Sequence, residues 1–169
     1  MMKEILLQFA EGVNRTTDTL IRITPKDKLG WKPGPTFLTI GQLLHHLGSC
    51  PGVISMAVAT GFPTAEQLQK FIEEEFKHTA DPSTAAKRLA ENFAVAKGQL
   101  AALSEADLGQ RMVTAPFGAS IPVGSALLFA FQHQLNHTMQ LFQYLKLLGL
   151  PVNTETLYFG KVPQGVSAV

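Results

Sequence analysis

A run of apolar residues spaced by three and four positions constrains the fold of this chain more than any other feature. The apolar side chains in this run are Ala86, Leu89, Phe93, Ala96, Leu100 and Leu103. Such spacing puts them along one stripe of an α-helix, and that stripe must be covered by other helices. The segment therefore predicts one member of a helical bundle, beginning at Asp81-Pro82-Ser83.

Three other segments carry helical signals of similar length. The first, residues 2–24, ends before Pro25 and has apolar residues near one face, namely Ile5, Leu6, Phe9, Val13, Leu20 and Ile21. The second begins at Thr39, where Gln42 completes a capping box, is bent by Pro51 and ends at residues 61–63. The last begins at Val123 or Ser125 and ends at Leu148, before Gly149 and Pro151.

The intervening segments predict smaller elements. Residues 64–76 are expected to form a short helix whose acidic run, Glu73-Glu74-Glu75, is a solvated face. The Pro/Gly-rich residues 29–35 form a linker in which Trp31 seals one end of the core. Residues 109–124, around Pro116-Phe117-Gly118, predict an irregular hairpin or paired loop. The expected fold class is all-α: a four-helix bundle with one short extra helix and a small hairpin or loop before the last helix.

Composition limits the class of protein. The chain has 169 residues, of which 46% are apolar, so we expect a single domain over residues 1–160 and a loose C-terminal tail over 161–169. Lys+Arg number 14 and Asp+Glu 13, with no basic stripe, which argues against nucleic acid and anionic membranes as partners. Cys50 is the single cysteine, which excludes an internal disulfide and suits the cytoplasm. The most apolar stretch, near residues 125–131, is too short to span a bilayer.

Histidines on two predicted helices suggest a metal site. His133 and His137 are spaced i, i+4, so both imidazoles project from one helical face and can bind one ion. A catalytic site usually needs a third protein ligand, and the second helix offers His45 or His46, of which only one can point the same way. Cys50, four residues after His46, is a softer candidate for a fourth ligand.

Other polar residues have weaker assignments. Gln140 and Tyr144 lie on the His133 side of the last helix and could orient the imidazoles. His78 has no partner in the sequence and is expected to be solvated. Spacing alone also fits a structural interpretation, in which the histidines fill a polar part of the core of a helical dimer.

Several stretches of the sequence resemble a known family. The first two are Leu29-Gly30-Trp31-Lys32-Pro33 and the predicted helix Thr39–Leu47, which reads Thr-Ile-Gly-Gln-Leu-Leu-His-His-Leu. Both resemble in pattern the DinB-like (DinB/YfiT-like) superfamily of bacterial four-helix bundles, and the second resembles a helix of that family. The segment 133–141, His-Gln-Leu-Asn-His-Thr-Met-Gln-Leu, and the closing Leu148-Gly149 resemble its last helix. The likeness extends over residues 2–151 and implies a three-histidine metal site in which His46, not His45, joins His133 and His137.

The sequence also departs from the family. Members often have an acidic residue and a further His or Arg around the second ligand, where this chain has Gln132, Gln134, Asn136 and Thr138. The three ligands remain, but an acid–base group from those positions is missing. The catalytic group is therefore unassigned among side chains and is expected to be a metal-bound water or thiolate.

The resemblance implies a divalent metal ion, with zinc or nickel favoured among the metals that imidazole suits. The implied function is a metal-dependent enzyme of the thiol S-transferase or hydrolase type, acting on a small molecule with a low-molecular-weight thiol as its partner. The alternative is a non-catalytic metal- or ligand-binding stress-response protein. A homodimer is expected because Phe129, Phe131, Phe142 and many leucines exceed what four helices readily cover.

Overall fold

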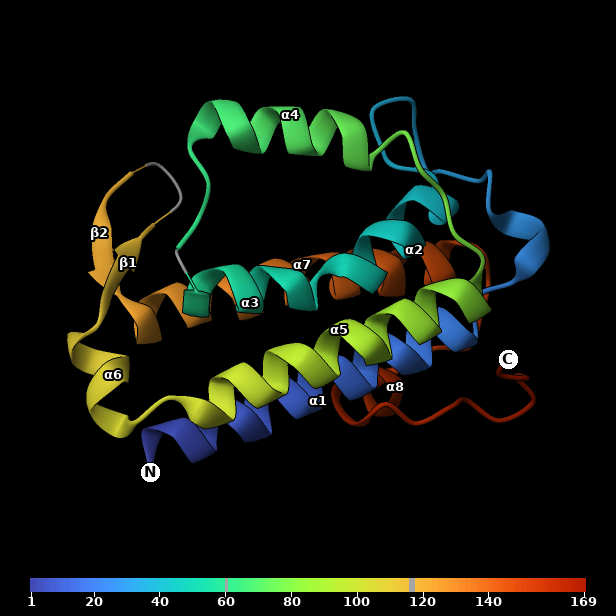
Figure 1. Ribbon diagram of the computed structural model, residues 1–169. Helices are drawn as coiled ribbons and strands as arrows, with labels where there is room; N and C mark the ends of the chain where they lie inside the picture. The colour runs from blue at the N-terminus through green and yellow to red at the C-terminus, as the bar shows by residue number, and fades with distance from the viewer. Residues whose placement is uncertain (60, 116–117) are drawn as a thin grey trace.

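Four long helical stretches form an all-α four-helix bundle in the computed structural model, which describes residues 1–59, 61–115 and 118–169 (Figure 1). They are α1 (Met2–Arg22), α2 (Ile40–Ser49) continued by α3 (Pro51–Ala59), α5 (Pro82–Ala102) and α7 (Val123–Leu147). Both α1 and the α2–α3 stretch pack against α5 and α7. The predicted class, four-helix order and bend at Pro51 are therefore confirmed.

Local sequence sets where these helices begin. The Thr39 side chain accepts a hydrogen bond from the backbone N–H of Gln42, and the Gln42 side chain accepts one from Thr39 N–H at 2.8 Å, so the predicted capping box is present. Asp81 caps α5 by accepting from the N–H groups of Ser83 and Thr84. Pro51 begins α3, where its missing N–H costs nothing.

Shorter elements complete the fold. Helix α4 (Ala65–Glu75) is the predicted short helix and lies above the bundle in Figure 1. Strands β1 (Met112–Thr114) and β2 (Ser120–Pro122) pair antiparallel, with Val113 opposite Ile121, which confirms the hairpin; residues 116–117 within it lie outside the described part.

Two short helices and a 3-10 turn were missed by the sequence analysis. They are α6 (Glu105–Gln110), α8 (Thr154–Phe159) and the turn Lys26–Lys28. Each short helix has its own capping box, Ser104 with Asp107 and Asn153 with Thr156, so the signal was in the sequence but each helix is too short to show periodicity.

The apolar core is divided along the bundle into two clusters. One contains Leu141, Phe142 and Leu145 of α7, and the other contains Val123–Phe131 side chains of the same helix. Between them, Gln134 and Thr138 are buried at 1% and 0% exposure. Thr17 of α1 meets them there: its Oγ lies 2.7 Å from that of Thr138, and Gln134 donates to it at 3.3 Å. A polar layer thus crosses the middle of the bundle.

Several expected apolar faces are only partly buried. Phe131 and Phe142, which we expected to exceed the capacity of the bundle, are 1% and 5% exposed, whereas Phe129 is 48% exposed. Ile5 and Phe9, placed with the core-facing residues of α1, are largely exposed. No helix in the described part of the chain combines the length and apolarity that crossing a membrane requires.

The C-terminal segment contacts α1. Val169 accepts a hydrogen bond from the Arg22 guanidinium at 2.9 Å and donates its N–H to the Arg22 carbonyl at 3.1 Å. Val166 packs against the cluster that contains Leu141. The domain boundary at residue 160 stays a prediction.

Adjacent leucines of α7 test this packing. Leu127 is fully buried, so Leu127→Ala is expected to lower the free energy of unfolding by about 2–5 kcal/mol. Leu128 is 57% exposed, and Leu128→Ala should change it by no more than about 0.5 kcal/mol. Urea denaturation of both variants measures the difference, and equal losses would contradict the assigned orientation of α7.

Candidate metal centre

Helices α2 and α7 bring three histidines together beside the polar layer. His46, buried in the second turn of α2, has its Nε2 atom 3.0 Å from Nε2 of His133. The ring centroid of His46 lies 5.0 Å from that of His133 and 4.5 Å from that of His137, and the last two are 4.7 Å apart. The structure therefore brings together all three histidines that the resemblance selected.

The spacing of these rings fits a shared cation. Two nitrogens bound to one ion at about 2.0–2.1 Å lie roughly 2.9–3.4 Å apart for bond angles between about 90° and 110°. The 3.0 Å separation of the His46 and His133 Nε2 atoms is within this range. The donor set of neutral nitrogen ligands suits zinc, nickel, copper or iron.

Cys50 offers a second donor set. The ligand atoms of His46, Cys50 and His133 all lie within 4.8 Å of one another. Cys50 is buried, and this burial, followed by the charge of Glu75, raises the pKa of its thiol well above the usual range. Two candidate sets thus share His46 and His133. The set with Cys50 is the one whose ligand atoms all lie within 4.8 Å of one another, and the set with His137 has that ring's centroid 4.5 Å from the centroid of His46.

Hydrogen bonding favours the set with His137. Gln140 Oε1 lies 3.1 Å from Nδ1 of His137, and an N–H at that atom donates to it. The Gln140 amide in turn donates to the Tyr144 hydroxyl at 2.9 Å, which donates to the carbonyl of Leu38 at 3.2 Å. These hydrogen bonds orient the ring through Nδ1, so a ligand bond from His137 would come from Nε2, the usual arrangement of a metal-bound histidine. The expected contact of Gln140 with the imidazoles is present.

Burial keeps two of the rings neutral. Desolvation, followed by the neighbouring histidines, lowers the pKa of His133 to about 4. Desolvation and His46 likewise lower the pKa of His137 to about 4. A neutral imidazole keeps the lone pair that a metal ion requires.

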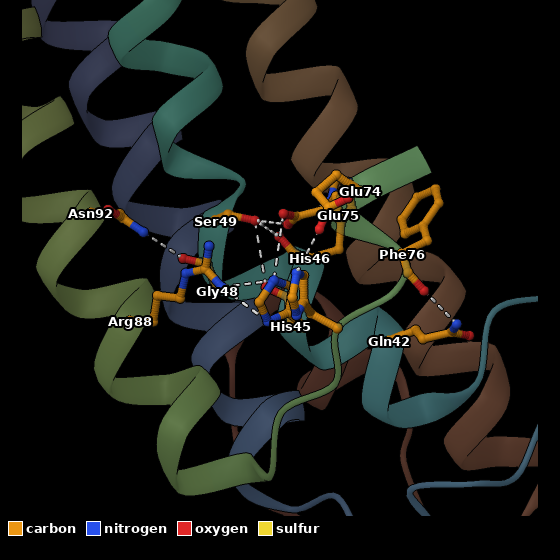
Figure 2. A network of polar contacts seen from close by, with 11 residues as sticks. Gln42, His45, His46, Gly48, Ser49, Glu74, Glu75, Phe76, Arg88 and Asn92 are labelled. Carbon is orange, nitrogen blue, oxygen red and sulfur yellow. Dashed lines mark hydrogen bonds and ion pairs between the residues drawn. The ribbon is translucent and has the colours of Figure 1, made fainter. Parts of the chain in front are cut away.

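Glu75 corrects the sequence analysis, which placed it on a solvated face. Of the residues of α4, Glu75 alone is buried, at 7% exposure. Its carboxylate accepts a hydrogen bond from the Ser49 hydroxyl, and its oxygens lie 3.5 Å from His46 Nδ1 and 3.5 Å from His45 Nε2 (Figure 2). Burial would raise its pKa, but the contacts with His46 and Ser49 outweigh burial and lower it to about 2.

Glu75 therefore lies behind His46, where a carboxylate can orient the imidazole of a metal ligand. The sequence contained a signal for this position: Leu68, Phe71, Ile72 and Glu75 follow the i, i+3, i+4, i+7 pattern, so Glu75 lies on the apolar side of α4. Phe76, the next residue, also contacts α2. Its ring centroid lies 5.4 Å from that of His46, and its carbonyl accepts a hydrogen bond from the Gln42 side chain at 2.7 Å.

Two glycines of α2 let other segments approach the site closely. A Cβ at Gly41 would lie 3.1 Å from Thr79 Cβ, and one at Gly48 would lie 3.1 Å from the Ala85 carbonyl and 3.3 Å from Arg88 Cβ. All three distances are tighter than ordinary contacts. The glycines therefore allow α5 and the segment after α4 to pack directly on the helix that carries His46.

A cleft of about 350 Å³ opens beside His46. A neighbouring cleft of about 310 Å³ lies on the His45 side of the helix and is lined by His78, which is 55% exposed as expected for a solvated side chain. The first cleft is lined by residues of α2, α3, α4 and α5, namely His46, Ser49, Cys50, Gly52, Val53, Met56, Phe71, Glu75, Arg88 and Asn92.

The bundle, the bent second helix and the facing histidines of α2 and α7 define a class of helical proteins with a candidate metal centre between two helices. The chain belongs to the DinB superfamily, whose pattern matches residues 8–141. This confirms the resemblance. No curated protein matches the sequence.

Solved structures agree in fold. A DinB-like protein of Bacillus cereus superposes with a TM-score of 0.71 at 18% identity, covering 89% of this chain and 95% of its own. YfiT of Bacillus subtilis, described as a probable metal-dependent hydrolase, has a TM-score of 0.67 at 18% identity and 88% coverage of both chains. A mycothiol-dependent maleylpyruvate isomerase has a TM-score of 0.64 at 15% identity, covering 96% of this chain and 65% of that one. At these identities the likeness concerns the fold.

The anchoring of α4 gives a prediction. Glu75→Ala removes charge-assisted contacts worth roughly 1.5–3 kcal/mol and is expected to raise amide hydrogen exchange across residues 65–75 by about tenfold or more. Glu74→Ala is the matched control, because Glu74 is exposed and its pairs with Lys77 and His78 are also exposed. Exchange measured by mass spectrometry that is equally fast in both variants would contradict the role of Glu75.

Proposed function

We propose that this chain is a metal-dependent enzyme whose divalent ion is bound by His46, His133 and His137, with zinc or nickel as the expected metal. The observation that carries the proposal is the convergence of imidazoles from two helices distant in sequence, with the Nε2 atoms of His46 and His133 3.0 Å apart. The cleft beside His46 supplies room for a reactant.

A divalent ion held by neutral ligands keeps its full charge, lowers the pKa of a water or thiol and polarises a carbonyl. The residues of the chain prepare this chemistry. Glu75 orients His46, and Gln140 orients His137. Val53, Met56 and Phe71 give the cleft apolar walls.

The proposed reaction is thiol S-transfer or hydrolysis of a small molecule. The volume of the cleft, about 350 Å³, lies at the lower end of the roughly 300–1,000 Å³ usual for small-ligand sites. A low-molecular-weight thiol is the proposed partner in S-transfer. Two structural relatives support these classes, since one is described as a probable metal-dependent hydrolase and another is named as mycothiol-dependent.

A second candidate is a non-catalytic metal- or ligand-binding protein of the stress response. It is favoured by the engagement of Glu75: among the residues that line the cleft at His46, Glu75 is the one carboxylate, and it is already occupied by Ser49, His45 and His46. A carboxylate so engaged is poorly placed to act as a general base.

We retain two further proposals from the sequence. A homodimer is supported by the apolar residues that α7 leaves exposed, Leu128, Phe129, Leu135 and Met139. A cytoplasmic location is supported by the single, unpaired cysteine.

Metal content tests the ligand assignment. Protein purified without an affinity tag and replenished with zinc or nickel is expected to hold about one equivalent, and His133→Ala or His137→Ala should reduce this below about 0.2. His78→Ala removes an exposed imidazole and should leave the content unchanged. Elemental analysis after dialysis measures it.

Cys50→Ser separates the two donor sets. Retention of metal in this variant, with loss in His137→Ala, supports the three-histidine site. Loss in Cys50→Ser with retention in His137→Ala would instead support the set completed by Cys50. Metal content below about 0.2 equivalents in the unaltered protein, equal to that of His137→Ala, would support a structural role for the histidines.

Turnover separates the enzyme from the binding protein. A chloro-dinitrobenzene offered with a panel of cellular thiols, and activated esters offered alone, are expected to react faster with metal-loaded than with metal-free protein. The increase should be lost in His133→Ala, because the ion cannot be held. Absence of metal-dependent turnover with every thiol and ester would favour the binding protein.

A further inference from the structure

Arg88 of α5 is a half-buried cation that lines both clefts. Within the described part of the chain no carboxylate forms an ion pair with it, and its hydrogen bonding is confined to His45. By contrast Lys87, its neighbour on the same helix, points outward and lies 3.9 Å from Glu91. Glu75 lines both clefts and Glu74 lines the one at His45, but neither forms an ion pair with Arg88, and a partly buried guanidinium without a paired anion is costly.

His45 holds the guanidinium in place. Nη1 of Arg88 lies 3.0 Å from Nδ1 and 2.9 Å from Nε2 of His45, and Figure 2 shows Arg88 extending from α5 toward that ring. A guanidinium can only donate, so one of the two ring nitrogens accepts from Arg88. An arginine has five N–H donors, so most of the fork remains available to a ligand.

Backbone packing also fixes the position of Arg88. The missing side chain of Gly48 leaves room for the stem of Arg88, whose Cβ and Cδ would lie 3.3 Å and 3.4 Å from a Cβ there. Asn92, one turn further along α5, donates to the Gly48 carbonyl at 2.9 Å and lines the same cleft as Arg88 and His46. The guanidinium is therefore pre-organised beside the site.

The charges around the cleft favour an anion. Among the described residues that line the cleft at His46, Glu75 is the one carboxylate, and its negative charge faces Ser49 and the two histidines of α2. Arg88 is the one formally charged base in that same set. A divalent ion at the histidines would add two positive charges, so the loaded site would carry a net positive charge.

We propose that Arg88 binds an anionic group of the substrate, a carboxylate or a phosphate, and thereby holds the reacting part of that molecule in the cleft beside His46. This deepens the proposed function, since it names the substrate as a small anionic molecule. A guanidinium fork binds the two oxygens of either group in a paired geometry that a lysine cannot reproduce.

The test is calorimetric titration of metal-free protein, so its result does not depend on turnover. The probes are succinate, inorganic phosphate and, as an uncharged control, dimethyl succinate. At least one of the two anions is expected to bind, with its Kd raised by about tenfold or more in Arg88→Gln. Lys87→Gln removes the same charge from the adjacent position and should leave the Kd unchanged. Arg88→Lys, which keeps the charge without the fork, should give an intermediate Kd.

Three results would overturn the proposal: neither anion binds the unaltered protein, Arg88→Gln binds as tightly as the unaltered protein, or Lys87→Gln weakens binding as much as Arg88→Gln. Circular dichroism establishes that each variant is folded, and Arg88→Lys decides the matter if Arg88→Gln is not. Loss of anion binding in Arg88→Gln together with an absence of metal-dependent turnover would uphold the anion site and reject the enzyme. Metal-dependent turnover together with anion binding that does not depend on Arg88 would uphold the enzyme and reject the anion site.

Discussion

Burial of polar groups at mid-height of the bundle is the constraint around which the rest of the structure is arranged. A buried polar group costs free energy unless it is paired, and α7 meets this requirement on two sides. Toward α1, Thr138 and Gln134 share hydrogen bonds with Thr17. Toward α2, His133 faces His46. Apolar side chains could fill this layer at no such cost, so its polarity is what the proposed metal site would explain.

Helix α4 is held against the bundle by polar contacts more than by burial of apolar side chains. Phe71 and Ile72 of α4 remain 48% and 40% exposed, while Glu75 is buried against Ser49 and the histidines of α2. Its carboxylate therefore lies beside the same imidazole that the metal proposal uses, 3.5 Å from Nδ1. If that site holds an ion, its occupancy and the position of α4 would both act on the orientation of His46.

The bundle and its histidines could be predicted because periodicity and motifs are local. The 3- and 4-residue steps identified α5, and the Thr39–Leu47 motif selected His46 over His45. Glu75 and Arg88 could not be assigned in the same way. Each meets its partner only when α4 or α5 packs on α2, and local sequence patterns do not predict which residues of different helices come into contact. The pattern of α4 places Glu75 on an inward face, but only the fold identifies the ring it meets there.

Pro51 has a consequence that extends past the bend itself. Residues before it, His46 and Cys50, carry the donor atoms, whereas Val53 and Met56, after it, line the same hollow from a separate helical segment. These two candidate donor residues thus precede Pro51 in the sequence, and the residues of α3 that shape the cleft follow it. If the metal proposal holds, substitutions in α3 can change the shape of this cleft while the donor residues before Pro51 stay intact, which would let one scaffold accept different reactants.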